Sequence, residues 1–169
     1  DGPGKTLLGA VQKEWLQAEL LAARDEAALT IWINSVPWIA QAEEGADHWG
    51  NYAAERAELS DFIVANRIGN LVMLSGDAHM VAADDGSNNV FASGAAGPGF
   101  PVFHAAALDR RGSVKGGPYS EGTFPGGGQF GLLDVADDGG TEIGVTFTGL
   151  TWEGTELIRY SRTFAVPGE

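Results

Sequence analysis

Cysteine is absent from the 169 residues of the chain. Disulfide bonds, zinc–thiolate sites and thiol nucleophiles are therefore excluded. Basic residues are also scarce, since 10 Lys and Arg stand against 23 Asp and Glu, which gives a formal net charge of −13. Such a chain repels phosphate backbones and anionic lipid, so we do not expect it to bind nucleic acid. A polyanionic substrate would need a local cation, from a metal ion or an arginine cluster.

Long hydrophobic runs are missing as well. No stretch approaches the roughly 20 apolar residues of a membrane-spanning helix, so no membrane span is expected. The chain opens with Asp1-Gly2-Pro3-Gly4 and shows neither an initiator methionine nor a signal peptide. We therefore expect a processed chain or a fragment.

The composition is that of a folded protein. Hydrophobic residues make up 44% of the chain and charged residues 20%, and the length suits one domain or a large part of one. Glycine is in excess, with 25 residues against a usual share of about 7%. This excess predicts long turns and loops.

The first half alternates helix-like and strand-like patterns. In residues 8–23 the apolar side chains recur every three or four positions, as on one face of a helix: Leu8, Val11, Trp15, Leu16 and Leu20. Residues 51–66 show the same helical spacing. The β-branched run 29–36, ended by Pro37, and the apolar run 71–74 predict buried strands. This order predicts α/β layering around a buried sheet.

The second half predicts an antiparallel meander after a long loop. Residues 129–135, 142–150 and 156–164 are typical of strands, with turn residues between them. Val90-Phe91-Ala92 predicts one more short strand. The Gly/Pro-rich stretch 94–128 exceeds the usual length of structureless loops, which favours a functional or mobile segment. We predict one unit over 1–169, with an α/β part (1–93), a Gly-rich loop (94–128) and a β meander (129–169).

Gly76-Asp77-Ala78-His79 follows an apolar strand directly, where α/β sheets carry their ligand crevice. In extended backbone, Asp77 and His79 would point to the same side. A carboxylate and an imidazole together suit zinc or another transition metal. A capping Asp beside a surface His is the alternative, because metal ligands come in sets.

Two further groups could serve an anionic ligand. Trp49, Tyr52 and Arg56 combine aromatic surfaces with an arginine, the natural bidentate partner of phosphate. The alternative is a hydrophobic contact at a helix start, with Arg56 paired to Glu55 or Asp61. The second group is the basic cluster Arg110, Arg111 and Lys115, which could attract an anion or offset nearby carboxylates. His104 is interpreted as a packed or surface histidine.

Four elements together resemble the alkaline phosphatase D (PhoD-like) family. They are the segment from Thr6 to Leu16, the strand end Ile33-Asn34-Ser35-Val36-Pro37, the Asp47-x-Trp49-x-x-Tyr52-x-x-x-Arg56 element, and the run from Asn70 to His79. The loop from Pro101 to Gly122 and the closing strands fit the same pattern. The resemblance covers nearly the whole chain.

The resemblance implies the C-terminal part of a layered α/β/β/α metallophosphoesterase sandwich of the calcineurin-like type. It implies metal-dependent hydrolysis of phosphate esters, whether mono- or diesters, by metal-activated water. Asp77 and His79 match the family's Gly-Asp-x-His metal-ligand motif. Arg56, Tyr52, Trp49 and Asn34 become candidates for substrate contact. Ca, Fe, Zn and Mn all remain candidate metals, and the family resemblance implies export to the periplasm, cell surface or medium.

The chain departs from the family pattern in one respect, because the family's earlier Asp-rich and Asn ligand motifs are not found in it. Two metal ions require more ligands than Asp77 and His79 offer. We therefore expect this polypeptide to be catalytically incomplete by itself. We also expect uncovered sheet edges, which would pair with its missing N-terminal part or lead to self-association. A non-catalytic binding or interaction module derived from the phosphatase fold is the alternative function.

Overall fold

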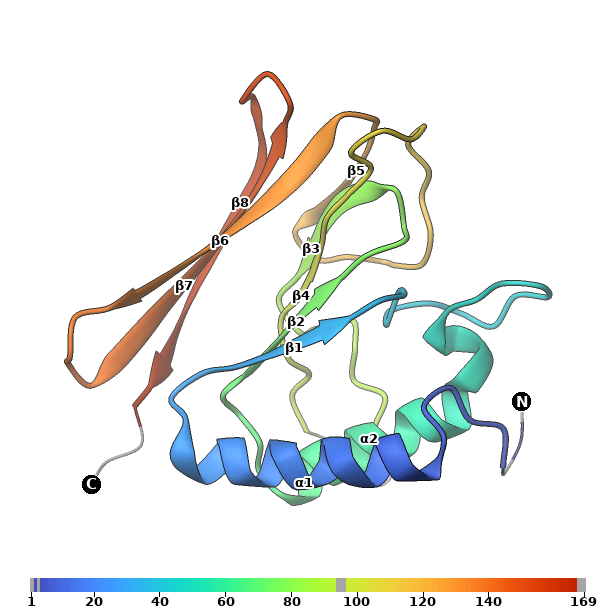
Figure 1. The fold of residues 1–169 in the computed structure, drawn as a ribbon, viewed down its shortest axis with the longest axis vertical. Coiled ribbons are helices and arrows are strands. Elements are labelled where there is room, and N and C mark those ends of the chain that lie inside the picture. The colour runs from blue at the N-terminus through green and yellow to red at the C-terminus, as the bar shows by residue number, and fades with distance from the viewer. Residues whose placement is uncertain (1, 3, 94–96, 167–169) are drawn as a thin grey trace.

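The computed structural model describes residues 2, 4–93 and 97–166. They form three layers, which are a pair of α-helices, a five-stranded sheet and a three-stranded sheet (Figure 1). The helical elements are α1 (Ala10–Glu26), the short 3-10 helix η1 (Trp49–Tyr52) and α2 (Ala53–Ala65). The strands are β1 (Thr30–Asn34), β2 (Leu71–Ser75), β3 (Met80–Asp84), β4 (Val102–His104), β5 (Gly122–Pro125), β6 (Gln129–Asp137), β7 (Glu142–Thr151) and β8 (Glu156–Ala165).

The five-stranded sheet has the order β1-β2-β4-β3-β5. Strands β1, β2 and β4 run parallel, whereas β3 is antiparallel to both of its neighbours. Strand β2 is apolar from Leu71 to Leu74 and lies between β1 and β4, as a central strand of a covered sheet should. The predicted α/β class and the strands at 29–36 and 71–74 are confirmed.

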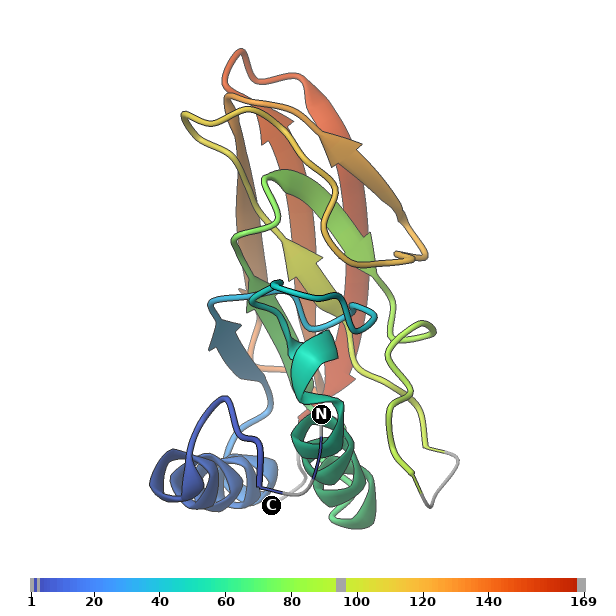
Figure 2. The ribbon, with the colours of Figure 1, turned by 90° about the vertical axis from the view of Figure 1, so that its right-hand side faces the viewer.

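Both α-helices cover the same face of this sheet (Figure 2). Their buried side chains recur at helical spacing, with Leu16 and Leu20 on α1 and Leu59 and Ile63 on α2. The layer between helices and sheet contains a cluster of tryptophans among aliphatic side chains. Trp38 and Trp49 are fully buried, and their ring centroids lie 4.9 Å apart.

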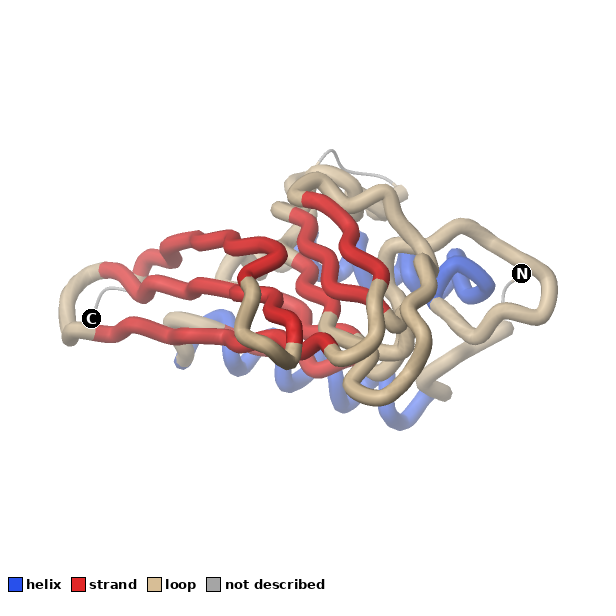
Figure 3. Tube along the Cα trace, turned by 90° about the horizontal axis from the view of Figure 1, so that it is seen from above, coloured by secondary structure: helices blue, strands red, loops and turns tan. Residues whose placement is uncertain are grey.

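The opposite face of the sheet packs against the meander of β6, β7 and β8 (Figure 3). All three strands pair antiparallel as predicted, and a turn at 138–141 joins β6 to β7. Phe103 of β4 stacks on Phe147 of β7 with ring centroids 4.9 Å apart. This contact marks the core between the two sheets.

Two sequence predictions are corrected by the structure. Val90-Phe91-Ala92 is not a strand. The predicted loop 94–128 contains two short strands, β4 and β5, while residues 94–96 lie outside the described part. Strand β4 has only three residues, set in a Gly/Pro-rich context, and its pairing with both β2 and β3 determines its conformation.

Three of the four expected layers are present in the described residues. The face of the three-stranded sheet that points away from the core carries no helix in residues 2, 4–93 and 97–166. None of the described helices has the length and apolar character needed to span a membrane. The division at 93 and 128 remains a prediction.

Candidate functional site

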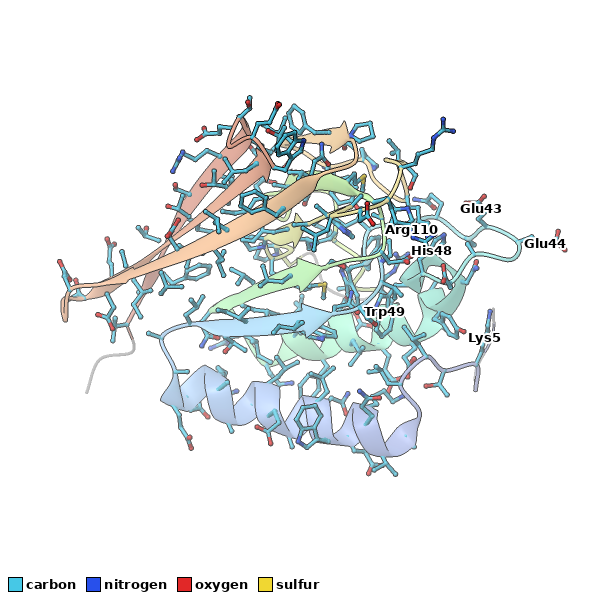
Figure 4. All side chains as sticks on the ribbon, turned by 45° about the horizontal axis from the view of Figure 1, so that its top comes forward. Lys5, Glu43, Glu44, His48, Trp49 and Arg110 are labelled. Atoms are coloured by element: carbon cyan, nitrogen blue, oxygen red, sulfur yellow. The ribbon has the colours of Figure 1, made fainter. Side chains whose placement is uncertain are left out.

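Three parallel strands end on a row of polar side chains. In the strand register Asn34 of β1 lies beside Ser75 of β2, which lies beside His104 of β4. These positions are the carboxyl ends of parallel strands, where α/β sheets bind their ligands. His48, Trp49 and Arg110 lie beyond this end of the sheet (Figure 4).

Asn34 connects this row to the loop that follows β1. Its Oδ1 accepts a hydrogen bond from Trp49 Nε1 at 3.1 Å, and its Nδ2 donates to Ser75 Oγ at 3.2 Å. Ser75 Oγ donates in turn to the carbonyl oxygen of Val36 at 2.8 Å. The structure therefore brings two of the predicted substrate-contact residues together, in a network that fixes the turn after β1.

Asp77 and His79 lie on the tight turn between β2 and β3. Both have left-handed backbone, with φ of 67° for Asp77 and 54° for His79. Asp and His tolerate this region better than most residues, yet each such residue costs on the order of 1–3 kcal/mol and such conformations cluster at functional sites. Both side chains are half-buried. Among the described residues, two of the three non-glycine residues with left-handed backbone lie in this turn, which marks it independently of its sequence motif.

The Gly-rich segment after β4 holds this turn in place. The backbone N–H of Ser113 donates to the carbonyl oxygen of His79 at 3.0 Å, and Ser113 Oγ donates to that of Ala78 at 3.0 Å. Lys115 Nζ lies 2.7 Å from Asp77 Oδ2 and 3.9 Å from Asp47 Oδ1. One lysine of the predicted basic cluster therefore offsets a carboxylate of the candidate site.

The same segment packs closely against the loop after β1. The N–H of Gly117 donates to the carbonyl oxygen of Ile39 at 2.7 Å. A Cβ at Gly116, where φ is 74°, would lie 2.1 Å from that same oxygen, so this approach requires glycine. A pocket of about 380 Å³ lies between the two segments, and its lining includes His48, Gly116 and Gly117.

Arg56 is buried beneath this loop rather than open to solvent, with 6% of its surface exposed. Its Nη1 donates to the carbonyl oxygens of Trp38 at 2.6 Å and Ala40 at 2.9 Å, and its guanidinium lies 3.6 Å from the centroid of the Phe91 ring. Burial lowers the pKa of Arg56 to about 10. The alternative pairing with Glu55 is not what these contacts show, because Glu55 accepts hydrogen bonds from the Thr6–Leu8 segment.

Tyr52 lies at the end of η1 and is half-buried, with Lys5 Nζ 4.6 Å from its ring centroid. Among the predicted substrate-contact residues, Tyr52 and Asn34 are partly exposed, whereas Trp49 is fully buried and Arg56 nearly so. In the described residues the ring of Tyr52 contacts Lys5 and not the Asp77–His79 turn, so its predicted role stays a prediction.

His104 is the residue that sequence reasoning undervalued. It is fully buried, its ring packs edge-on against Tyr119 with centroids 5.4 Å apart, and neither Nδ1 nor Nε2 has a hydrogen-bond partner among the described residues. Burial lowers the pKa of His104 to about 3. His104 follows a short apolar run, Val102-Phe103, much as Asp77 follows the apolar run of β2. This pattern is the sequence signal that could have placed His104 at this edge of the sheet.

The donors at the site make only part of a metal centre. Asp77 and His79 are ligands of the kind that transition metals and zinc accept. In the part of the chain that the structure describes, however, no group of three or more His, Cys, Asp or Glu side chains could hold a metal ion. The described residues therefore do not complete a metal site by themselves.

Known proteins share this fold and its sequence pattern. The chain is similar to a solved structure titled "Structure of PhoD", with a TM-score of 0.56 and 16% sequence identity. The match covers 92% of this chain but 36% of the solved chain, so this chain spans about a third of that protein. No match was found among curated proteins. A family model described as PhoD-like phosphatase matches residues 1–116, which confirms the resemblance seen in the sequence: the chain belongs to the PhoD-like phosphatase family.

Proposed function

We propose that this chain carries Asp77 and His79 as metal ligands of a metal-dependent phosphate-ester hydrolase whose remaining ligands come from further polypeptide. The observation that carries the proposal is the turn between β2 and β3. It holds both residues in left-handed backbone at the carboxyl end of a parallel strand, in a chain of the PhoD-like phosphatase family.

Lys115 positions Asp77 through an ion pair. The ammonium group restrains the carboxylate in one orientation, and the two hydrogen bonds from Ser113 restrain the backbone that follows it. Asn34, Trp49 and Arg56 act as positioning residues in this proposal, because their polar atoms hold the loop after β1. Tyr52 is proposed to contact the substrate, a phosphate-ester small molecule.

A non-catalytic module is the second candidate function. The specific observation that favours it is the incomplete ligand set in the described residues. Under this alternative the strained turn would still be stabilised by Ser113 and Lys115, but neither Asp77 nor His79 would bind metal.

Two features of the proposal are open to direct test. The metal is proposed to be one of Ca, Fe, Zn or Mn, since the Asp and His donor types do not select among them. The protein is proposed to be exported, as the family resemblance implies. Cell fractionation of the native host with an antibody to this chain tests export, and finding it in the cytoplasm alone would refute it.

The deciding experiment compares Asp77→Asn and His79→Ala with the matched control Asp137→Asn, at the end of β6. Each variant is made in the whole gene product and in the 169-residue chain. Hydrolysis of p-nitrophenyl phosphate and of its bis-ester is measured with each metal, and metal binding is measured by calorimetry. In the whole product we expect both site variants to lose more than the roughly 10–100-fold that an outer-shell partner is worth.

The 169-residue chain is expected to show neither activity nor tight binding of two metal ions. Tight binding of two ions by this chain would overturn the proposed incompleteness. Full activity and unchanged metal content in His79→Ala and Asp77→Asn would overturn the ligand assignment, whereas a parent whole product without activity on either substrate with any of the metals would favour the non-catalytic module. Asp137→Asn preserves the side-chain oxygen that accepts from Gly139 N–H, so its activity should equal that of the parent.

A further inference from the structure

Strand β1 has an open edge. It pairs with β2 on one side, and among the described strands it has no neighbour on the other. The N–H of Thr30 donates to the carbonyl oxygen of Asn70 on the β2 side. Because backbone groups alternate along a strand, those of Ile31 and Ile33 point to the open side. The strand presents Thr-Ile-Trp-Ile-Asn, without the charges or proline that natural edges use to prevent pairing.

The open edge of β1 is flanked by an apolar groove on the helix side. The groove holds about 420 Å³ between α1 and β1, and Trp15, Leu20 and Trp32 are among its lining residues. Helix α1 runs along β1 and presents Trp15, 57% exposed, and Val11, 84% exposed (Figure 1). The helix therefore has an apolar face that the sheet does not cover.

The second sheet is open on the same side. Strand β6 pairs with β7 alone within residues 97–166, and Figures 1 and 2 show β6 on the side of the molecule that carries β1. A groove of about 210 Å³ lies between the sheets there, lined in part by Leu74, Phe103 and Leu133. On β1, Ile33 is 79% exposed. Both sheets therefore stop at one common side of the molecule.

We propose that this side, with the edges of β1 and β6 and the two grooves beside them, is the docking surface for added β-strands from further polypeptide of the same PhoD-like protein. An added strand would satisfy the outward backbone groups of Ile31 and Ile33. Its side chains would point alternately into the helix-side groove and toward the gap between the sheets. The inference does not rest on the proposed activity.

Two observations select this occupant. The solved PhoD chain has about two thirds of its length outside the matched region, so that protein contains ample polypeptide beyond this part of the fold. A second copy of this chain is a poorer partner, because each copy carries a formal net charge of −13 and the surface offers no basic residue on β1 to offset it.

The absence of cysteine makes a clean test available, because a single introduced thiol is then the only one in this chain. Ile33→Cys on β1 and Val11→Cys on α1 are introduced singly, with Trp152→Cys as the control. Trp152 is 73% exposed and lies in the turn between β7 and β8. The rate of labelling by a maleimide dye is measured in the folded 169-residue chain and in the product of the whole gene.

We expect the thiols of Ile33→Cys and Val11→Cys to label at least tenfold more slowly in the whole product than in the 169-residue chain. The thiol of Trp152→Cys should label equally in both. Equal rates for all three variants would overturn the proposal, as would a whole gene product no longer than this chain.

The same measurement separates the proposed occupant from a second copy. Protection of the Ile33→Cys thiol that grows with the concentration of the 169-residue chain would assign the surface to a second copy and refute the proposed occupant. Labelling reports whether a position is covered and does not report catalysis. It therefore remains informative if the metal-ligand assignment fails.

Discussion

The tryptophan cluster between the helices and the five-stranded sheet is closed, although a groove opens at its margin between α1 and β1. The layer between the two sheets is open on the side of β1 and β6. In the closed layer Trp38 and Trp49 are fully buried against each other. In the open layer Phe103 and Phe147 stack at the centre, but Ile33 remains 79% exposed and a groove of about 210 Å³ runs beside Leu74.

One strand takes part in both layers and shows where the difference comes from. In β1, Trp32 points into the closed layer and packs against Trp38, while Ile33 points to the other face and is exposed. The two residues are neighbours in sequence and both are strongly apolar. The exposure of Ile33 therefore reflects the layer that it faces and not its residue type. Such an exposed apolar side chain is expected where further strands would complete a layer.

The largest expected effect comes from breaking the closed layer. Trp38→Ala removes a side chain that is fully buried among four aromatic rings, so the free energy of unfolding should fall by about 5 kcal/mol. Urea unfolding followed by circular dichroism measures it. Trp152→Ala, at an exposed turn, should change stability by less than about 0.5 kcal/mol. A loss below about 2 kcal/mol for Trp38→Ala would mean that this layer is not closed.

Local pattern was enough to predict much of this fold. The spacing of Leu16 and Leu20 identifies a helix, and β-branched runs identify β1 and the meander. The placement of Asp77 and His79 after a strand also follows from sequence. Periodicity did not distinguish buried from exposed apolar residues, since Val11 and Trp15 belong to the same apolar pattern and are exposed. A pattern reports which face is apolar but not what covers it.

Contacts between distant segments were beyond sequence reasoning. Strand β4 is too short for its own pattern, and it is defined by pairing with β2 and β3. The ion pair of Lys115 with Asp77 joins residues 38 positions apart. Arg56, a candidate for substrate contact, is buried and holds the loop after β1. These features depend on tertiary packing, which the spacing of residue types along the sequence does not predict.

The second prediction tests the closed layer through a titratable side chain buried inside it. His104 is buried there with both ring nitrogens unpartnered in the described residues, and burial lowers its pKa to about 3 from the ordinary value of 6.5. Between these two values the unfolded chain binds a proton that the folded chain does not. Stability therefore falls as the pH decreases from 6.5 toward 3, by about 2 kcal/mol between about pH 7.5 and pH 5.

His104→Leu, a change of similar volume, should remove this part of the pH dependence and cost less than about 1.5 kcal/mol at about pH 7.5. Urea unfolding of both proteins at the two pH values gives the difference, and carboxylates that titrate in both proteins cancel. An identical loss of stability in the variant on acidification would show that His104 is not the buried titrating group.

The smallest expected effect lies in the open layer. Ile33→Thr keeps the β-branch and places a hydroxyl at a residue that is 79% exposed, so it should cost less than about 0.5 kcal/mol. Val72→Thr makes a similar change on β2 at a fully buried position of the same face, and the unpaired hydroxyl should cost about 2 kcal/mol. Urea unfolding of the 169-residue chain compares the two. Equal losses of unfolding free energy for the two variants would mean that Ile33 is already covered in solution. The contrast between a closed and an open layer depends most on Ile33, and it would then fail.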